Sequence, residues 1–202
     1  MSDMVHLNGN KLCAIDCETT GLDSSIHEII EIAIVVLDSF VKPTGELFHI
    51  FKIPERPSVI DDKALRVQHL KKVDIMTRGV DNFTAIDAFE DWFNTLGLRP
   101  LKTIVPIGHN YAFDRDFLRA WLGCNAYDTF FSSQYRDTMG VANYMNDRAD
   151  FRSEQYPYPK RSLQYLCNQV QLENPAKHTA LGDAVTTAEV YRRFLISGPL
   201  TL

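Results

Sequence analysis

The sequence predicts a layered domain of the α/β or α+β class. Apolar stretches typical of strands lie at 11–18 and 28–37, early in the chain. Beyond residue 80 the apolar residues recur every three or four positions, which is the spacing of amphipathic helices. Strands that precede a mixture of strand and helix are typical of domains in which helices pack on a sheet.

Three strands are expected in the first quarter of the chain. Residues 11–18 alternate enough in polarity for a strand, and residues 28–37 are almost all apolar, as in a buried central strand. A third strand is expected at 47–53, after a turn at 42–45 whose sequence is Lys-Pro-Thr-Gly. Three strands in succession predict an antiparallel meander.

The first long helix is expected to start at the possible caps Asp81 and Asn82 and to end at Gly97. Its aromatic series from Phe83 to Phe93 is interpreted as core packing. Two prolines in 151–159 indicate a loop. The other expected elements are a short strand at 103–108 and helices at 112–122, 138–145, 162–170 and 182–195.

Composition restricts the class of protein. Of 202 residues, 45% are hydrophobic and 23% charged, as in soluble globular proteins and unlike disordered, collagen-like or membrane chains. The longest apolar run is far shorter than the roughly 20 residues that cross a bilayer, and the first 11 residues do not resemble a signal peptide. We therefore expect a single cytoplasmic domain with no membrane contact.

The balance of charge, the cysteines and three of the histidines further restrict the kinds of protein and site to be expected. The 26 acidic and 21 basic residues argue against a protein that coats nucleic acid through charge alone, but not against a metal-dependent enzyme. The four cysteines form no CxxC pair and are expected to be small buried hydrophobes. His6, His49 and His69 lack acidic partners at useful spacing, so surface or core roles are expected for them.

Asp16 and Glu18 are the first residues that suggest chemistry. Residues two apart on a strand point to one face, about 6.5 to 7 Å from each other, so both carboxylates can reach one ion or an adjacent pair. A glycine turn follows them, and the ends of strands are where α/β folds place their sites. Alone, such a pair is more typical of a strand that emerges into solvent.

Two further acids lie near the starts of helices. Asp114 is expected in a first helical turn, where it could serve only to complement the helix dipole, and Asp116 is expected on the solvated side. His178 and Asp183 would diverge on one straight helix, so they can converge only if His178 lies on the preceding loop. That layout suits a proton acceptor beside a metal-binding acid.

Together these residues resemble the DEDDh branch of the DnaQ-like 3′-to-5′ exonucleases. The resemblance extends from about Leu12 to Phe194, and Thr179 occupies the position where the sister DEDDy branch has tyrosine. It implies one exonuclease domain over residues 1–202, with motifs across about 12–196, and an RNase H-like fold in which helices flank a central mixed five-stranded sheet. The motifs that carry it are Asp16-x-Glu18, Asn110-x-x-Phe113-Asp114 and His178-x4-Asp183.

The resemblance also implies a role for each residue. Asp16 would bridge two divalent cations, Mg²⁺ or Mn²⁺; Glu18 and Asp183 would complete one site, and Asp114 would hold the second ion largely through water. His178 would take the proton of the attacking water. The substrate would be nucleic acid with a free 3′ end, single-stranded in particular, shortened to nucleoside 5′-monophosphates. Contacts to the terminal nucleotide would come from Thr19, Thr20, Gly21, Leu22, His109 and Asn110.

Several alternatives remain open on the sequence alone. A non-catalytic nucleic-acid-binding or partner-recruiting module would not need all five site residues, and a small-molecule metallohydrolase would leave the nucleotide contacts unused. A stand-alone enzyme and a proofreading subunit beside a polymerase both fit, on DNA or RNA. The chain departs from proofreading relatives at Gln68-His69, where they carry His-Gly or Asn-Gly. The loop at 151–159, followed by Lys160 and Arg161, also looks longer than the family minimum.

Overall fold

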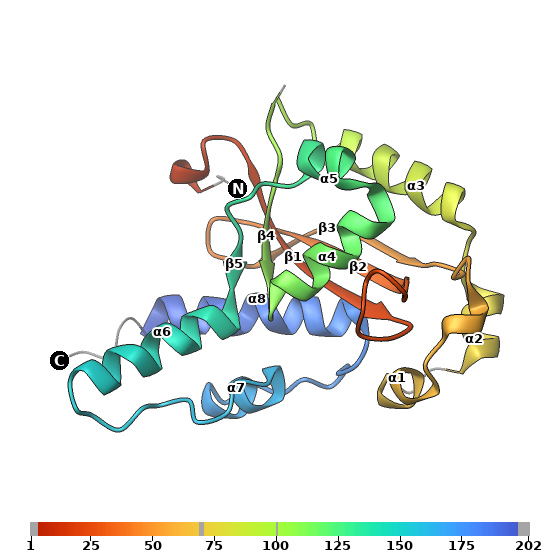
Figure 1. The fold of residues 1–202 in the computed structure, drawn as a ribbon. Coiled ribbons are helices and arrows are strands. Elements are labelled where there is room, and N and C mark those ends of the chain that lie inside the picture. The colour runs from red at the N-terminus through yellow and green to blue at the C-terminus, as the bar shows by residue number, and fades with distance from the viewer. Residues whose placement is uncertain (1–3, 69–70, 100, 198–202) are drawn as a thin grey trace.

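A five-stranded sheet in the order β3-β2-β1-β4-β5 lies at the centre of the protein (Figure 1). The computed structural model describes residues 4–68, 71–99 and 101–197. β2 pairs antiparallel with both β1 and β3. β4 pairs in parallel with β1, and β5 pairs in parallel with β4. This arrangement confirms the predicted mixed sheet and meander. The strands are β1 (Lys11–Thr19), β2 (Ile29–Leu37), β3 (Pro43–Phe51), β4 (Ile104–Gly108) and β5 (Arg136–Asp137).

Helices cover both faces of this sheet. One face packs against α3 (Asn82–Thr95), α4 (Tyr111–Leu122) and α5 (Cys124–Phe130). The other packs against α8 (Ala180–Ser197), and α8 in turn contacts α6 (Thr138–Phe151) and α7 (Leu163–Gln169). The short helices α1 (Asp62–Val67) and α2 (Lys72–Arg78), with the 3₁₀ turn Pro57–Val59, connect β3 to α3; a further 3₁₀ turn, Val5–Leu7, precedes β1.

Small side chains let α8 approach the sheet closely. Ala180, Ala184 and Ala188 are buried against the alternate residues of β1 and β2 that face this helix. At the start of the helix, a Cβ on Gly182 would collide with the carbonyl oxygen of Ala176, so the preceding loop also packs tightly. These contacts determine how closely the first turn of α8 packs against the sheet.

The predicted position of the turn before the third strand is wrong. β3 begins at Pro43 and ends at Phe51, and the chain reverses earlier, because the carboxylate of Asp38 accepts hydrogen bonds from the backbone N–H groups of Phe40 (2.8 Å) and Lys42 (3.0 Å). β3 is an edge strand, so a proline at its start removes no bond from the centre of the sheet.

Some helix and core predictions also need correction. α6 continues six residues past the predicted end, to Phe151, because its outer turns bury little more than Ala149 and so lack an apolar period. Phe89 is fully buried as expected, but Phe83 is 73% exposed because it lies in the first turn of α3. Cys124 is exposed, whereas the other three cysteines are buried as predicted.

None of the helices in the described part of the chain combines the length and apolar composition that a membrane span requires.

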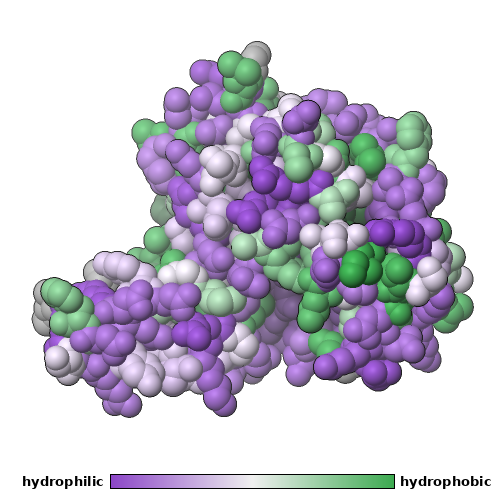
Figure 2. Space-filling view, viewed as in Figure 1, coloured by the Kyte–Doolittle hydropathy of each residue, from purple (hydrophilic) through white to green (hydrophobic). Residues whose placement is uncertain are grey.

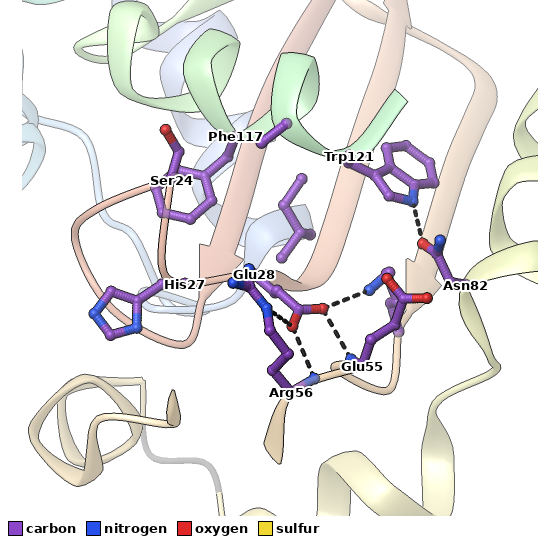
Figure 3. Close-up of a pocket in the computed structure, with 11 residues that line it drawn as sticks. Ser24, His27, Glu28, Glu55, Arg56, Asn82, Phe117 and Trp121 are labelled. Atoms are coloured by element: carbon purple, nitrogen blue, oxygen red, sulfur yellow. Dashed lines mark hydrogen bonds and ion pairs between the residues drawn. The ribbon is translucent and has the colours of Figure 1, made fainter. Parts of the chain in front are cut away.

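Glu28 joins the β1–β2 connection to the segment after β3 (Figure 3). Its carboxylate accepts hydrogen bonds from the backbone N–H groups of Glu55 (2.8 Å) and Arg56 (2.9 Å), and from Lys52 Nζ and Arg56 Nε, each at 3.2 Å. Burial raises the pKa of Glu28, but these bonds and the charge of Lys52 outweigh it, so the pKa lies below its usual value. The backbone of Glu28 meanwhile bonds both the N–H and the hydroxyl of Thr20, which fixes the turn after β1.

We expect Glu28→Gln to destabilise the protein by about 3 to 5 kcal/mol, because Lys52, only 2% exposed, would lose its countercharge inside the protein. Urea denaturation at pH 7 measures the change. Since the pKa of Glu28 is lowered on folding, the difference should shrink as the pH falls through the carboxyl range. Glu55→Gln, which neutralises an exposed carboxylate in the same segment, should cost less than about 0.5 kcal/mol. Equal losses would contradict this role for Glu28.

Candidate active site

Three carboxylates meet where β1 passes the start of α8. Asp16 and Glu18 come from β1, and Asp183 comes from the first turn of α8. One carboxylate oxygen from each residue lies within 4.8 Å of those from the other two. An all-oxygen set of this kind fits a hard divalent cation such as Mg²⁺ or Mn²⁺.

Burial and neighbouring acids make the carboxyl groups of Asp16 and Glu18 hard to ionise. Burial is the largest cause for Asp16, and the charges of Asp114, Glu18 and Asp183 add to it, so the pKa of Asp16 lies well above its usual value. Burial and the charges of Asp183 and Glu31 raise the pKa of Glu18 to about 8. Like charges held this close without a countercharge are costly, and a bound cation would remove the cost.

Asp114 lies beside this cluster and is attached to β1. It is 3% exposed in the first turn of α4, and its Oδ1 accepts a hydrogen bond from the backbone N–H of Cys17 at 2.9 Å. β1 pairs with β4 only as far as Ala14, so Asp114 takes over a backbone donor beyond the end of that pairing. Complementing the helix dipole would not require such burial. Asp116 is exposed, as predicted.

The loop before α8 holds Asp183. Asn174 Nδ2 donates to Asp183 Oδ1 at 2.6 Å, and the backbone N–H of His178 donates to Oδ2 at 3.1 Å. His178 has a left-handed backbone, with φ of 62°, and precedes the helix, which starts at Ala180. The predicted layout, with the histidine on the loop and the acid in the helix, is therefore observed. No motif in the sequence identified Asn174.

The turn after β1 forms one wall of a groove. Thr19 Oγ1 donates to the carbonyl of Gly21 at 2.7 Å, and the hydroxyl of Thr20 accepts from the N–H of Glu28 at 2.9 Å, so both hydroxyls have partners within the protein. A Cβ on Gly21 would collide with the ring of His27, which explains the glycine. The groove beside this turn has a volume of about 390 Å³ and is lined by Cys17, Glu18, Thr19, Gly21, Leu22, Asp61, Lys63, Ala64, Val67, Gln68 and Phe113.

Gln68 is a residue of this groove that the sequence did not identify as functional. Its Nε2 donates to the carbonyl of Thr19 at 2.9 Å, and its side chain also bonds Glu18, which opposes the rise in the pKa of that carboxyl. The only hint in the sequence was the departure from the proofreading pattern at Gln68-His69. His69 lies outside the described residues.

The other two predicted substrate contacts lie at the end of β4. The Nδ1 atom of His109 is 2.8 Å from Thr138 Oγ1, and burial lowers the pKa of the ring. Asn110 is exposed with a left-handed backbone, and its N–H donates to Asp137 at 3.0 Å, as does that of Tyr111 at 2.9 Å. Asp137 also caps α6, so it joins the starts of two helices at this edge of the site.

The prediction that His49 lacks an acidic partner is wrong. His49 has an acidic partner, since its Nε2 lies 2.7 Å from Glu31 Oε1. The two residues are 18 apart in sequence and meet because β2 and β3 pair in antiparallel register, which no local spacing reveals. Within the described residues, His6 is exposed near Arg136 and has no acidic partner.

Comparisons with known proteins show the family and the fold of this chain. A family model described as an exonuclease, RNase_T, matches residues 13–191. Two proteins described as DNA polymerase III PolC-type, from Thermotoga petrophila and Thermotoga maritima, are each 27% identical to this chain over 181 residues. Each match covers 90% of this chain but only 12% of the relative, so the chain spans about an eighth of their length.

Solved structures share the fold at low sequence identity. The zinc-bound complex of exonuclease I from E. coli with single-stranded DNA has a TM-score of 0.75 and 17% identity, over 95% of this chain and 41% of that one. The nuclease domain of 3′hExo, a DEDDh family member bound to rAMP, has a TM-score of 0.67 and 16% identity, over 94% of this chain and 93% of that one.

Crowding at Glu18 should make the metal-free protein less stable as the pH rises. Folding raises the pKa of Glu18 from 4.5 to about 8, so the folded state holds this proton more tightly and stability is lost between about pH 5 and 8. In EDTA, we expect the melting temperature of the wild type to fall across this range and that of Glu18→Gln to fall less. Glu90→Gln, an exposed acid on α3, is the control; parallel curves for all three proteins would contradict the crowding.

Proposed function

Since this chain belongs to the exonuclease family, we propose that it removes nucleoside 5′-monophosphates from the 3′ end of a nucleic acid strand by metal-dependent hydrolysis. The observation that carries the proposal is the cluster of Asp16, Glu18 and Asp183, with oxygens within 4.8 Å of one another, beside a groove of about 390 Å³. The cluster supplies the ligands that phosphodiester hydrolysis needs, and the groove has the volume of a nucleotide-sized ligand site.

Asp16, Glu18 and Asp183 would hold the divalent cations, with Mg²⁺ as the natural ion and Mn²⁺ as a substitute. Asp114 would contribute the oxygen that is not engaged by the N–H of Cys17. Bound in pairs, such ions neutralise the phosphoryl oxygens, activate the attacking water and stabilise the leaving oxygen. Raised carboxyl pKa values in a cleft are typical of functional sites, and this supports the assignment.

His178 would act as the general base, taking the proton of the attacking water. Its backbone donates to Asp183, so the loop that carries the imidazole is attached to the carboxylate cluster itself. An imidazole accepts a proton near neutral pH, which suits this role.

The terminal nucleotide would occupy the groove beside Glu18. Leu22, 83% exposed at its rim, would pack on the terminal base, and the backbone of Thr19 to Gly21 would contact the sugar. Gln68 would keep this turn in register with Glu18. His109 and Asn110 would form the opposite side. Recognition of a free 3′ hydroxyl in this groove would restrict cleavage to strand ends.

The comparisons support a single-stranded substrate and a polymerase as a partner. The solved exonuclease I binds single-stranded DNA and the nuclease domain of 3′hExo binds rAMP, so we propose a single strand of DNA or RNA. The PolC-type relatives make a DNA polymerase the partner to seek by co-purification. A non-catalytic module is not favoured, because the acids and histidine that catalysis needs are all present.

Digestion of 5′-labelled single-stranded DNA and RNA of equal length, with Mg²⁺, Mn²⁺ or EDTA, tests the reaction. We expect a metal-dependent ladder that shortens from the 3′ end and disappears in Asp16→Ala. Asp116→Ala removes an exposed acid of α4 and should leave the ladder intact. No nucleotide release, or a ladder that survives in Asp16→Ala, would refute the proposal.

His178→Gln should lower kcat by about 10²- to 10⁴-fold, the usual contribution of a general base. Because the metal ligands remain, Mg²⁺ should still raise the melting temperature of this variant as in the wild type. His6→Gln, at an exposed histidine, is the matched control. If His178→Gln lost metal stabilisation and turnover together, its role would be structural.

A further inference from the structure

We propose that the substrate strand leaves the active site past His109 and binds through its phosphates to a basic segment, Lys160 and Arg161, that precedes α7. The proposal rests on the exonuclease function argued above and extends it to the nucleotides behind the terminal one. It adds that the single strand proposed above is bound over several nucleotides.

Charge around the carboxylates favours such a segment. Asp16, Glu18, Asp114 and Asp183 lie together, Glu31 adds its charge nearby, and the chain carries a net charge of −5. A polyanion approaching this site is repelled unless cations line its path. On the side of the terminal nucleotide, Lys63 lines the groove. The basic segment would serve the other side.

His109 places the basic segment at the site. Its ring bonds the hydroxyl of Thr138, at the start of α6, and also the backbone of Arg161. The charge of Asp183 acts on the same ring, so the carboxylate cluster lies within electrostatic range. In Figure 2, viewed as Figure 1, a notch separates the block of α6 and α7 at lower left from the rest of the protein. The contact with His109 therefore places the backbone of the basic segment at the edge of the site.

The loop that carries the segment is fixed on both sides. Asn146 of α6 bonds the backbone of Tyr158 twice, donating to its carbonyl at 2.8 Å and accepting from its N–H at 2.9 Å. The ring of Tyr158 packs edge-on against Phe194 of α8, with centroids 5.6 Å apart. On the other side, Ser162 caps α7. A backbone held in this way loses little entropy when a ligand binds.

The two cationic side chains are available to a ligand. Both are exposed, and neither forms an ion pair or a side-chain hydrogen bond with the residues that the structure describes. On helix α4, by contrast, Arg115 pairs with Asp116 at 3.1 Å and Arg119 with Asp128 at 2.8 Å. The same loop exposes Tyr156, and cations combined with an exposed aromatic ring are typical of sites that bind single strands.

Binding is measured best in the Asp16→Ala background, where the strand is not digested. Fluorescence anisotropy with dT and rU 12-mers gives Kd for the Lys160→Ala/Arg161→Ala variant and for a control of equal charge, Lys42→Ala/Arg152→Ala. The control residues are exposed in the β2–β3 turn and at the far end of α6. We expect the first pair to weaken binding of both strands at least tenfold and the control less than twofold.

Salt dependence tests the nature of the contact. If two phosphates are lost, the slope of log Kd against log salt should fall by about 1.4, since each single-strand phosphate contributes about 0.7. A weaker affinity with an unchanged slope would overturn a phosphate contact. The single variants Lys160→Ala and Arg161→Ala would each lower the slope by about half of this amount.

Kinetics separates this inference from the exonuclease proposal. The p-nitrophenyl ester of thymidine 5′-monophosphate fills only the terminal groove, so the double variant should hydrolyse it as the wild type does, while its KM for 12-mers rises at least tenfold. If the wild type cleaves neither substrate, the exonuclease proposal fails, and the anisotropy data still judge the basic segment. If the double variant binds and cleaves 12-mers as the control does, the basic segment has no role.

Discussion

The organising constraint of this protein is electrostatic: several carboxylates must be held within a few ångströms of one another at the end of β1. Burial and the charges of neighbouring acids raise the pKa values of Asp16 and Glu18, so the fold must hold the cluster together against a tendency to separate. β1 achieves this because it is a central strand, paired with β2 on one side and β4 on the other. The alanines of α8 then bring Asp183 close enough to complete the cluster.

Two glutamates at opposite ends of the β1–β2 connection show how the fold separates support from chemistry. Glu28 accepts bonds from two backbone N–H groups and two cations, and its pKa is lowered. Glu18 faces other acids instead, and its pKa is raised to about 8. The carboxylate of Glu28 is stabilised by hydrogen-bond donors and holds the turn in place. The carboxylate of Glu18 is surrounded by other acids and, among the described residues, lacks a countercharge. The turn that Glu28 locks carries Thr20, so the supporting carboxylate also positions one wall of the groove beside Glu18.

The sequence predicted those parts of the protein that depend on local patterns. Strand β2 is a run of apolar, β-branched residues and was placed almost to the residue, and the spacing of His178 and Asp183 required the observed loop-then-helix layout. Partners that are distant in sequence and belong to no motif were missed. Asn174 reaches Asp183 through a loop, Gln68 reaches Thr19 across 49 residues, and Glu31 meets His49 only through strand register. Such contacts depend on tertiary packing, which single-sequence periodicity does not encode.

The net charge of a protein is a poor guide to whether it binds a polyanion, because the attraction depends on the sign of the charges that line the path of the ligand. The acids that give the chain its negative charge include those gathered at the site, where bound cations would offset them. Beyond the reach of those cations, a phosphate of the proposed substrate would depend on the side chains of the protein alone. Lys63 lines the groove beside Glu18, and the backbone of Arg161 contacts His109, on which the charge of Asp183 also acts, so positive charge lies near the negative centre in two places. A strand held at both places would present its terminal phosphodiester to the carboxylates, which is how an acidic protein can bind an acidic polymer at one point of its surface.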